Sequence, residues 1–219
     1  MAHPPFTTLH RSHQTMLLAH RAMSRDLECL ARAAAVLAER PDAARARALA
    51  KYADQLLHLI EHHHTGEDDV LWPELAKRGA DPEALELMAA EHGELAELLQ
   101  QTGRAAADLT TDHSAALRLS AAASDTHSLL TRHAADEEDQ LLGRLAPHLT
   151  DEVWDALRKH MMKTQAPWAL TFLPPWLAAV ATPEERSGVP APLIAKLGGS
   201  RLRALRRAAF GEELAAQAA

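Results

Sequence analysis

The chain has few of the residues on which several classes of protein depend. It contains one cysteine, Cys29, among 219 residues, which excludes an intramolecular disulfide and any cysteine-rich zinc site. Tyrosine also occurs once, and aromatic residues make up only 4% of the chain. No stretch approaches the roughly 20 consecutive apolar residues that cross a bilayer. The N-terminal segment "MAHPPFTTLHRSHQ" lacks the apolar run of a signal peptide, so we expect a cytoplasmic protein with no membrane partner.

Positive charge is scarce as well. Lysine and arginine number 23 against 30 aspartates and glutamates, which gives a formal charge of -7. No general attraction to nucleic acid is therefore expected. Apolar residues make up 47%, and many of them are alanine and leucine, which suits a helical core. The length predicts one domain with appendages, or two small domains at most.

Apolar residues recur at helical spacing through almost all of the first 164 residues, and no β-branched alternating run indicates a strand. One helix is expected from about Thr8 to Arg40, where Pro41-Asp42 breaks the pattern and restarts it. The second helix is expected to end at Trp72-Pro73. Asp81-Pro82 predicts the start of the third helix, and Thr110-Thr111-Asp112 that of the fourth. The fold class is therefore all-α, with a four-helix core over residues 1–148.

The remaining residues, 149–219, are expected to form an extension. It would contain a fifth helix from Thr150, a proline-rich segment and a short basic amphipathic segment. We expect it either to pack on the core or to extend away from it. Its tryptophans would cap the mouth of the bundle or form the surface of a homodimer: Trp154, Trp168 and Trp176. Its basic residues are most simply a solvated helix face: Lys196, Arg201, Arg203, Arg206 and Arg207.

Histidine is the residue that the chain has in excess. There are fourteen, and the stretch "HLIEHHHTGEDDVLWPEL", residues 58–75, places four of them beside five acidic side chains. A repeated pattern also emerges over the whole core. His20 is followed by the pair His63-x-x-x-Glu67, and His92 is followed at a similar separation by His133-x-x-x-Glu137. The chain thus resembles two αα-hairpins, each with a lone histidine opposite a His/Glu pair.

Side chains four apart on a helix project to the same side, so each pair can direct a nitrogen and a carboxylate into one small volume. All six residues fall on the apolar stripes of their helices, where a carboxylate is costly unless it is paired or binds a metal. Imidazole and carboxylate without thiolate suit iron, manganese or zinc, and two carboxylates able to bridge indicate two ions. The predicted metal ligands are His20, His63, Glu67, His92, His133 and Glu137.

If both carboxylates bridge and an oxo or hydroxo group is shared, roughly one coordination position stays open on each ion. Such positions bind dioxygen, peroxide or nitric oxide, so the pattern indicates a reactive site and a small-molecule partner. An additional ligand from Tyr52 or His13 is an alternative, although regular helix geometry places each more than a turn away from the nearest predicted ligand.

For each residue next to a predicted ligand, two positions are considered. His62 and His64 point about 100° to either side of His63, which favours a supporting or solvated position over a metal ligand. Asp68 and Glu138 follow the two glutamates, and either hydrogen-bond the ligand imidazoles or belong to ordinary helix surface.

At these residues the sequence strongly resembles the hemerythrin-like family, the HHE cation-binding proteins. The family pattern has its counterparts in "AHRAM" around His20, "HHTGEDDVLWP" from His63, "EHGEL" around His92 and "HAADEE" from His133, and the match spans about residues 9–148. The resemblance implies an up-down-up-down four-helix bundle that holds two non-haem iron ions as its cofactor. It is similar to bacterial members of the family with the pattern H…HxxxE…H…HxxxE.

The sequence departs from the oxygen-carrying members at one position. Those proteins have a fifth histidine four residues from the one on the third helix, whereas Met88 and Ala96 stand there in this chain. The missing nitrogen puts simple oxygen carriage in doubt. The resemblance then implies peroxide disproportionation or nitric-oxide handling in oxidative or nitrosative stress, or alternatively a sensing module without turnover. A metal-free or zinc-stabilised bundle is the third reading.

Overall fold

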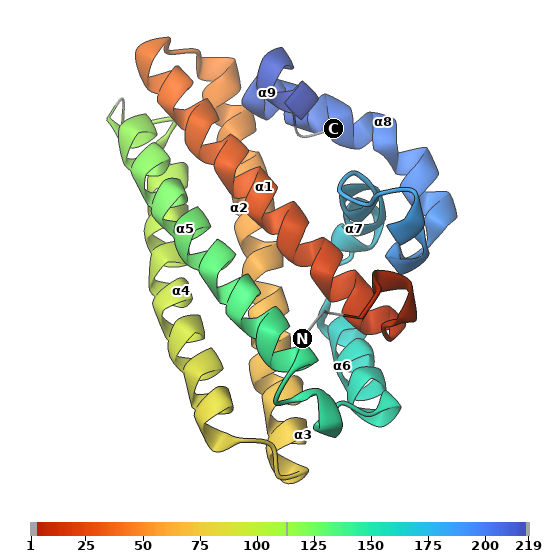
Figure 1. Cartoon of the computed structure of the whole chain (residues 1–219). Coiled ribbons are helices and arrows are strands. Elements are labelled where there is room, and N and C mark those ends of the chain that lie inside the picture. The colour runs from red at the N-terminus through yellow and green to blue at the C-terminus, as the bar shows by residue number, and fades with distance from the viewer. Residues whose placement is uncertain (1–3, 113, 218–219) are drawn as a thin grey trace.

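The computed structural model describes residues 4–112 and 114–217, and within these ranges every regular element is a helix. Four long helices run alternately up and down and form a bundle (Figure 1). The all-α bundle predicted from the sequence is thereby confirmed. The four helices are α1 (Arg11–Glu39), α2 (Ala43–Gly66), α4 (Pro82–Asp108) and α5 (Ala115–Leu142).

Two of the three predicted start signals act as helix caps, whereas Asp112 accepts from the N–H of Ser114, the residue before α5. The Asp42 carboxylate accepts hydrogen bonds from the backbone N–H groups of Ala44 and Arg45, and the helix that follows is α2. Asp81 accepts one from the N–H of Glu83 at the start of α4. Each aspartate satisfies backbone donors that have no partner within the helix. His113, which follows the predicted cap of α5, lies outside the described residues.

The expected end of the second helix at Trp72-Pro73 is wrong. α2 continues without a loop through a π-helical segment, η2 (Glu67–Leu71), into α3 (Trp72–Lys77). The N–H of Trp72 bonds to the carbonyl of Glu67, five residues earlier. Pro73 therefore falls in the first turn of α3, where its missing N–H costs little. The helix continues below the other three and reverses direction only before Asp81.

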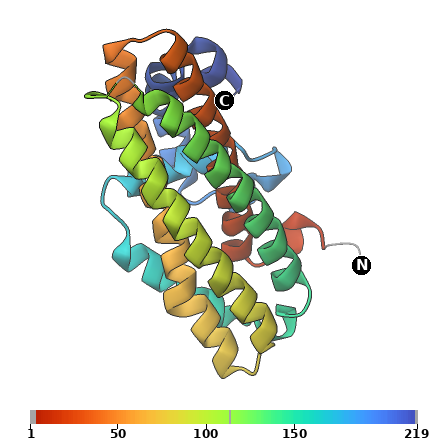
Figure 2. The same cartoon turned by 90° about the vertical axis from the view of Figure 1, so that its left-hand side faces the viewer.

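The extension lies along one side of the bundle, over α1 and α2, while α4 and α5 form the opposite side (Figures 1 and 2). Its helices are α6 (Asp151–Thr164), α7 (Ala169–Ala178), α8 (Pro192–Phe210) and α9 (Glu212–Gln217). Three short turns of helix complete the described chain: η1 (Phe6–Thr8), η3 (Ala146–His148) and η4 (Glu184–Gly188).

The extension packs on the bundle and shares its core. Phe172, Trp176 and Phe210 belong to the same cluster of buried apolar residues as Leu27 and Leu56 of the bundle. Trp154 is buried too, against the lower end of the bundle with Trp72 and Met88. Trp154 and Trp176 therefore do not form a surface for a dimer. Of the two expectations for the extension, packing on the core is the one observed.

One of the five basic residues expected on a solvated face lies in the interior. Arg206 is 1% exposed and donates from one guanidinium nitrogen to both carboxylate oxygens of Asp26 on α1, at 2.9 Å. The hydroxyl of Tyr52 and the indole N–H of Trp176 donate to the same carboxylate, at 2.6 and 2.7 Å. The expectation failed for Arg206 because a buried carboxylate on another helix cannot be seen in the local pattern. The other four are exposed.

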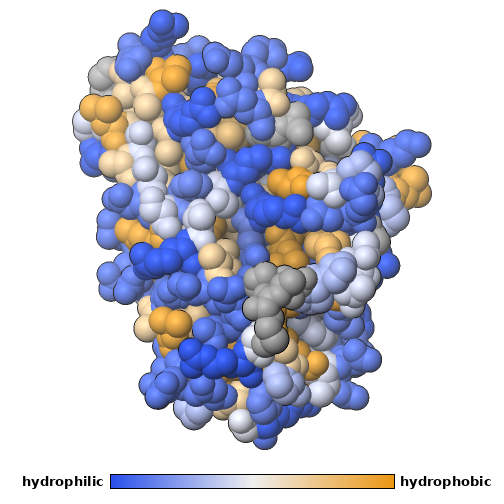
Figure 3. Space-filling view, viewed as in Figure 1, coloured by the Kyte–Doolittle hydropathy of each residue, from blue (hydrophilic) through white to orange (hydrophobic). Residues whose placement is uncertain are grey.

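Figure 3 shows hydrophilic side chains over most of one face of the molecule, with apolar ones in small separate groups. Among the described helices, none combines the length and the apolar character needed to cross a membrane.

Candidate metal centre

The six side chains singled out in the sequence converge inside the bundle. His20 comes from α1, His63 from the end of α2, Glu67 from the π segment, His92 from α4, and His133 and Glu137 from α5. All six are buried, and Glu137 and His133 have no exposed surface. Four helices thus contribute ionisable groups to one interior volume.

His20 and His63 form the first set of donors with both glutamates. The Nε2 atoms of the two imidazoles lie 3.0 Å apart. His20 Nε2 is 3.1 Å from a carboxylate oxygen of Glu137, and His63 Nε2 is 2.9 Å from one of Glu67. One atom from each of these four side chains fits within 4.8 Å of the others. Two nitrogens bound at about 2.1 Å to one ion, at right angles, would stand about 3 Å apart.

His92 and His133 form the second set, and they have an unexpected third member. Their Nε2 atoms lie 3.2 Å apart. His64 joins them, because one ring nitrogen from each of the three histidines lies within 4.8 Å of the others. The ring centroid of His64 is 4.8 Å from that of His92 and 5.1 Å from that of His133. The second set is therefore composed of three imidazoles.

Of the two positions expected for His64, the solvated one is wrong. Its side chain is 5% exposed, and its Nδ1–H donates to the backbone carbonyl of Ile60 at 2.7 Å. Nε2 is then left with a free lone pair, buried and without a hydrogen-bond partner. The interior side of a bundle helix is at least about 100° wide, so two consecutive residues can both face inward. The side chain of His64, rotated by about 100° from that of His63, thus faces His92 and His133.

Glu67 and Glu137 each lie between the two sets. Glu67 has one oxygen 2.9 Å from His63 Nε2 and the other 3.8 Å from His92 Nε2. One oxygen of Glu137 is 3.1 Å from His20 Nε2 and 3.9 Å from His133 Nε2. None of the four carboxylate oxygens makes a hydrogen bond of acceptable geometry within the described chain. Such groups are costly to bury without a compensating charge, and both are placed to bridge two cations.

Groups outside the two sets orient the imidazoles. The Nδ1 atom of His20 is 3.0 Å from a Glu138 carboxylate oxygen, that of His92 is 2.7 Å from Asp68, and that of His133 is 2.9 Å from Glu91. A carboxylate on Nδ1 fixes the ring so that Nε2 faces the interior. Asp68 and Glu138 thus make hydrogen bonds to the imidazoles, which was one of the two alternatives predicted for them. Glu91 was not singled out, although it directly precedes His92 in the family motif.

The π segment begins at Glu67. The N–H of Glu67 bonds to the carbonyls of both His63 and His64, and the helix widens from there to Leu71. Short π segments inside α-helices are frequent at functional sites. Behind this segment lies α6, whose Met161 sulfur would collide with a Cβ atom at position 66. Gly66 therefore allows α6 to pack directly against the segment that holds Glu67.

Burial and neighbouring charges shift the pKa values of the ionisable groups in the site. Burial alone would lower the pKa of His20, but the Glu137 carboxylate, 3.1 Å from its Nε2, raises it to about 10. Burial and the nearby Glu137 raise the pKa of Glu67 well above its ordinary value. Burial lowers the pKa of His63 to about 3 and that of His133 to about 4. At neutral pH the imidazolium of His20 therefore faces the Glu137 carboxylate, whereas His63 and His133 are neutral.

The other candidate ligands lie elsewhere. Tyr52 donates its hydroxyl to Asp26, away from both sets. The ring of His13 stacks on Trp154 with centroids 5.2 Å apart. His62 points to α6 and lies 2.9 Å from the hydroxyl of Thr164. The π segment begins after these positions in α2, so it does not bring Tyr52 closer to the site.

The donor set fits hard or borderline metal ions. Five imidazole nitrogens and two carboxylates suit iron, manganese or zinc, and no thiolate competes because Cys29 is near Leu214 of the extension.

A model of the hemerythrin HHE cation-binding domain matches residues 11–145, which covers all seven donors. The comparisons with curated proteins and with solved structures found no match. The matched range is well over half of the chain, which therefore belongs to the hemerythrin HHE cation-binding domain family.

Proposed function

We propose that this protein holds two non-haem iron ions and uses them to bind and convert hydrogen peroxide. The observation that supports this most strongly is the pair Glu67 and Glu137, whose four buried carboxylate oxygens lack hydrogen bonds while five imidazoles surround them. A pair of cations would neutralise both carboxylates. His20 and His63 would hold one ion, and His64, His92 and His133 the other, with the two carboxylates shared.

The donor count predicts where a small ligand binds. With a shared oxo or hydroxo group, the ion at His64, His92 and His133 would have about six donors, which fills an octahedral shell. The ion at His20 and His63 would have about five and keep one open position. The expectation of an open position on each ion is thus replaced, since His64 fills one of them. We expect peroxide to bind beside His20 and His63.

The protein's own groups support this chemistry in two ways. When bound, two iron ions supply two electrons to one peroxide and recover them from a second, which converts two molecules of peroxide to two of water and one of dioxygen. The bundle excludes bulk water from the open position, since His20 is 2% exposed. Glu138, on Nδ1 of His20, is half-buried and connects this imidazole to solvent as an acceptor and donor of protons.

Binding of dioxygen or nitric oxide without turnover, as a sensor, is the second candidate. Two observations favour it. With His64, the site has five histidines, as in the oxygen-carrying members. The apparent lack of a fifth histidine was the reason for favouring turnover over oxygen binding. The Met161 contact at Gly66 also connects α6 to the segment that holds Glu67, and His160 of α6 is 3.4 Å from Asp69. A change at the iron pair would then reach the extension directly.

Oxygen release decides between the two candidates. Iron-loaded protein is mixed with peroxide in an oxygen electrode, beside free iron at equal concentration and the variants His63→Ala and His62→Ala. The proposal predicts oxygen release well above free iron, lost in His63→Ala and retained in His62→Ala, whose ring faces α6. Release no greater than free iron, from protein that contains iron and binds nitric oxide, would reject turnover and leave the sensor.

A further inference from the structure

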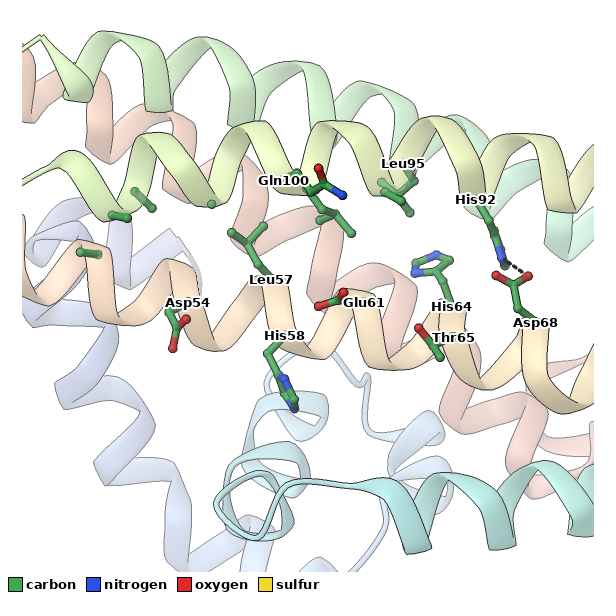
Figure 4. A pocket seen from close by; sticks show the side chains of 16 residues that line it. Asp54, Leu57, His58, Glu61, His64, Thr65, Asp68, His92, Leu95 and Gln100 are labelled. Carbon is green, nitrogen blue, oxygen red and sulfur yellow. Dashed lines mark hydrogen bonds and ion pairs between the residues drawn. The ribbon is translucent and has the colours of Figure 1, made fainter.

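A groove of about 440 Å³ runs between α2 and α4 and ends at the candidate metal centre. Leu57, Leu95 and Leu99 are among its lining residues, with small side chains on the α4 side. Its inner end is formed by His64, His92 and Asp68. Figure 4 shows His64 pointing from α2 towards α4, with the hydrogen bond between His92 and Asp68 beside it.

The charged side chains along this groove are all acidic. Asp54 and Glu61 of α2 and Asp68 of η2 line it, and they stand seven residues apart, which is about two helical turns or about 10 Å for each step. All three are exposed. Among the described residues that line the groove, none is a lysine or an arginine. A one-signed row of carboxylates over an apolar floor concentrates cations from solution.

The inner end of the row has an independent feature that points to a cation. His64 lines the groove, and its Nε2 atom is buried and has no hydrogen-bond partner. The residue is 95% buried, and its ring points from α2 towards α4, across the groove (Figure 4). A neutral imidazole nitrogen of this kind is a metal ligand. The carboxylate row therefore leads to a donor atom that has no other partner.

The other interfaces between neighbouring helices of the bundle leave no comparable groove to the candidate metal centre in the part of the chain that the structure describes. α1 and α5 are closely packed and joined by the hydrogen bond between Ser24 and Thr131, as are α4 and α5 by that between Thr102 and Thr126. The extension covers the side formed by α1 and α2. Trp72 and the apolar cluster around it fill the lower end. The two other cavities described, near Asp112 and near Glu97, include none of the seven donors.

From these features we infer that the groove between α2 and α4 is the route by which divalent metal ions reach the buried centre. Asp54 and Glu61 attract the hydrated cation and hold it transiently, and His64 is the first donor that replaces its water. This inference rests on the proposed metal centre, and it concerns how the ions arrive, not which reaction they support. The ligand class is a free divalent cation, with ferrous iron as the expected cargo.

The test is the rate at which metal-free protein takes up cobalt(II), followed by stopped-flow absorbance at several salt concentrations. The variant Asp54→Asn/Glu61→Gln removes two carboxylates from the groove. The matched control Glu97→Gln/Asp125→Asn removes two from the surface of α4 and α5, away from the groove. We expect the groove variant to load about tenfold more slowly than the control at low salt. The difference should shrink at high ionic strength, where charges are screened.

A second variant tests the route by size instead of charge. Ala96 is an exposed lining residue on α4, and Ala96→Phe should slow loading at every salt concentration. All variants should reach the wild-type cobalt content and spectrum at the end of the reaction. Equal loading rates for the groove variant and its control, with a normal end-point, would overturn the route alone. Failure of the wild-type protein to bind cobalt would overturn the metal centre as well.

Discussion

His63 and His64 are neighbours in the chain, yet their imidazoles belong to different sets of donors. His63 Nε2 lies 3.0 Å from that of His20, whereas His64 is grouped with His92 and His133. One helix turn thus supplies a ligand to each of two proposed ions, and the Glu67 carboxylate, one turn later, lies between both sets. The two sites are therefore coupled through a single stretch of α2.

Removing the imidazole of His64 should weaken one metal site and spare the other. His64→Ala is expected to lower the affinity for the second ion at least about tenfold, which is about 1.4 kcal/mol. Titration of metal-free protein with ferrous iron, followed by metal analysis after gel filtration, measures this. His62→Ala serves as the control, because that ring contacts Thr164. A full and equal metal content in both variants would show that His64 is not a ligand.

Replacing Glu67 by glutamine should affect the metal-bound protein far more than the metal-free one. Burial and Glu137 raise the pKa of Glu67 and so favour its neutral form in the metal-free protein. A neutral amide of similar shape should therefore change the unfolding free energy by less than about 1 kcal/mol. Metal at a thousandfold excess over its dissociation constant stabilises by about 4 kcal/mol. Glu67→Gln should lose most of that gain in thermal melts with iron, whereas Glu94→Gln should keep it.

Metal binding should release protons at neutral pH. The pKa of His20 is raised to about 10 and that of Glu67 is also raised, and both must lose a proton to act as ligands. Apparent metal affinity should therefore rise with pH through neutrality. The stability that the raised pKa of His20 gives the metal-free protein is fully present below about 6.5 and is lost as pH rises through about 10. Calorimetry in buffers of different ionisation enthalpy measures the released protons, and heats independent of the buffer would contradict this.

The buried pair Asp26 and Arg206 should hold the extension to the bundle. Arg206→Met removes the buried cation from Asp26 and leaves only Arg25, whose Nε is 3.5 Å from the same carboxylate, so the cost should approach the lower end of the about 3–5 kcal/mol for breaking a buried pair. Exposed Arg203→Met should change stability by less than about 0.5 kcal/mol. Urea unfolding measures both, and limited proteolysis should show faster cleavage within residues 165–217 in Arg206→Met alone. If Arg206→Met proved as stable as the Arg203 variant, the extension would be held by apolar packing only.

The sequence predicted the bundle and the convergence of six side chains because both follow from local periodicity. Helical spacing orients His63 and Glu67 to the same side, and the repeated pattern places the lone histidines opposite them. His64 was missed because a 100° rotation was taken to lead out of the interior, although it leads to the second set of donors. Pro73 was misread as a stop because a π segment had shifted it into a first turn. Arg206 could not be placed, because its partner Asp26 is 180 residues away.

The central claim is that two iron ions share Glu67 and Glu137, and Mössbauer spectroscopy of protein loaded anaerobically with iron-57 and then oxidised tests it most directly. The account predicts about two irons per chain that are magnetically coupled and give two distinct signals of equal area, as expected for one ion with two imidazoles and another with three. A single uncoupled iron per chain, or iron removed by desalting while the helices stay folded, would contradict it.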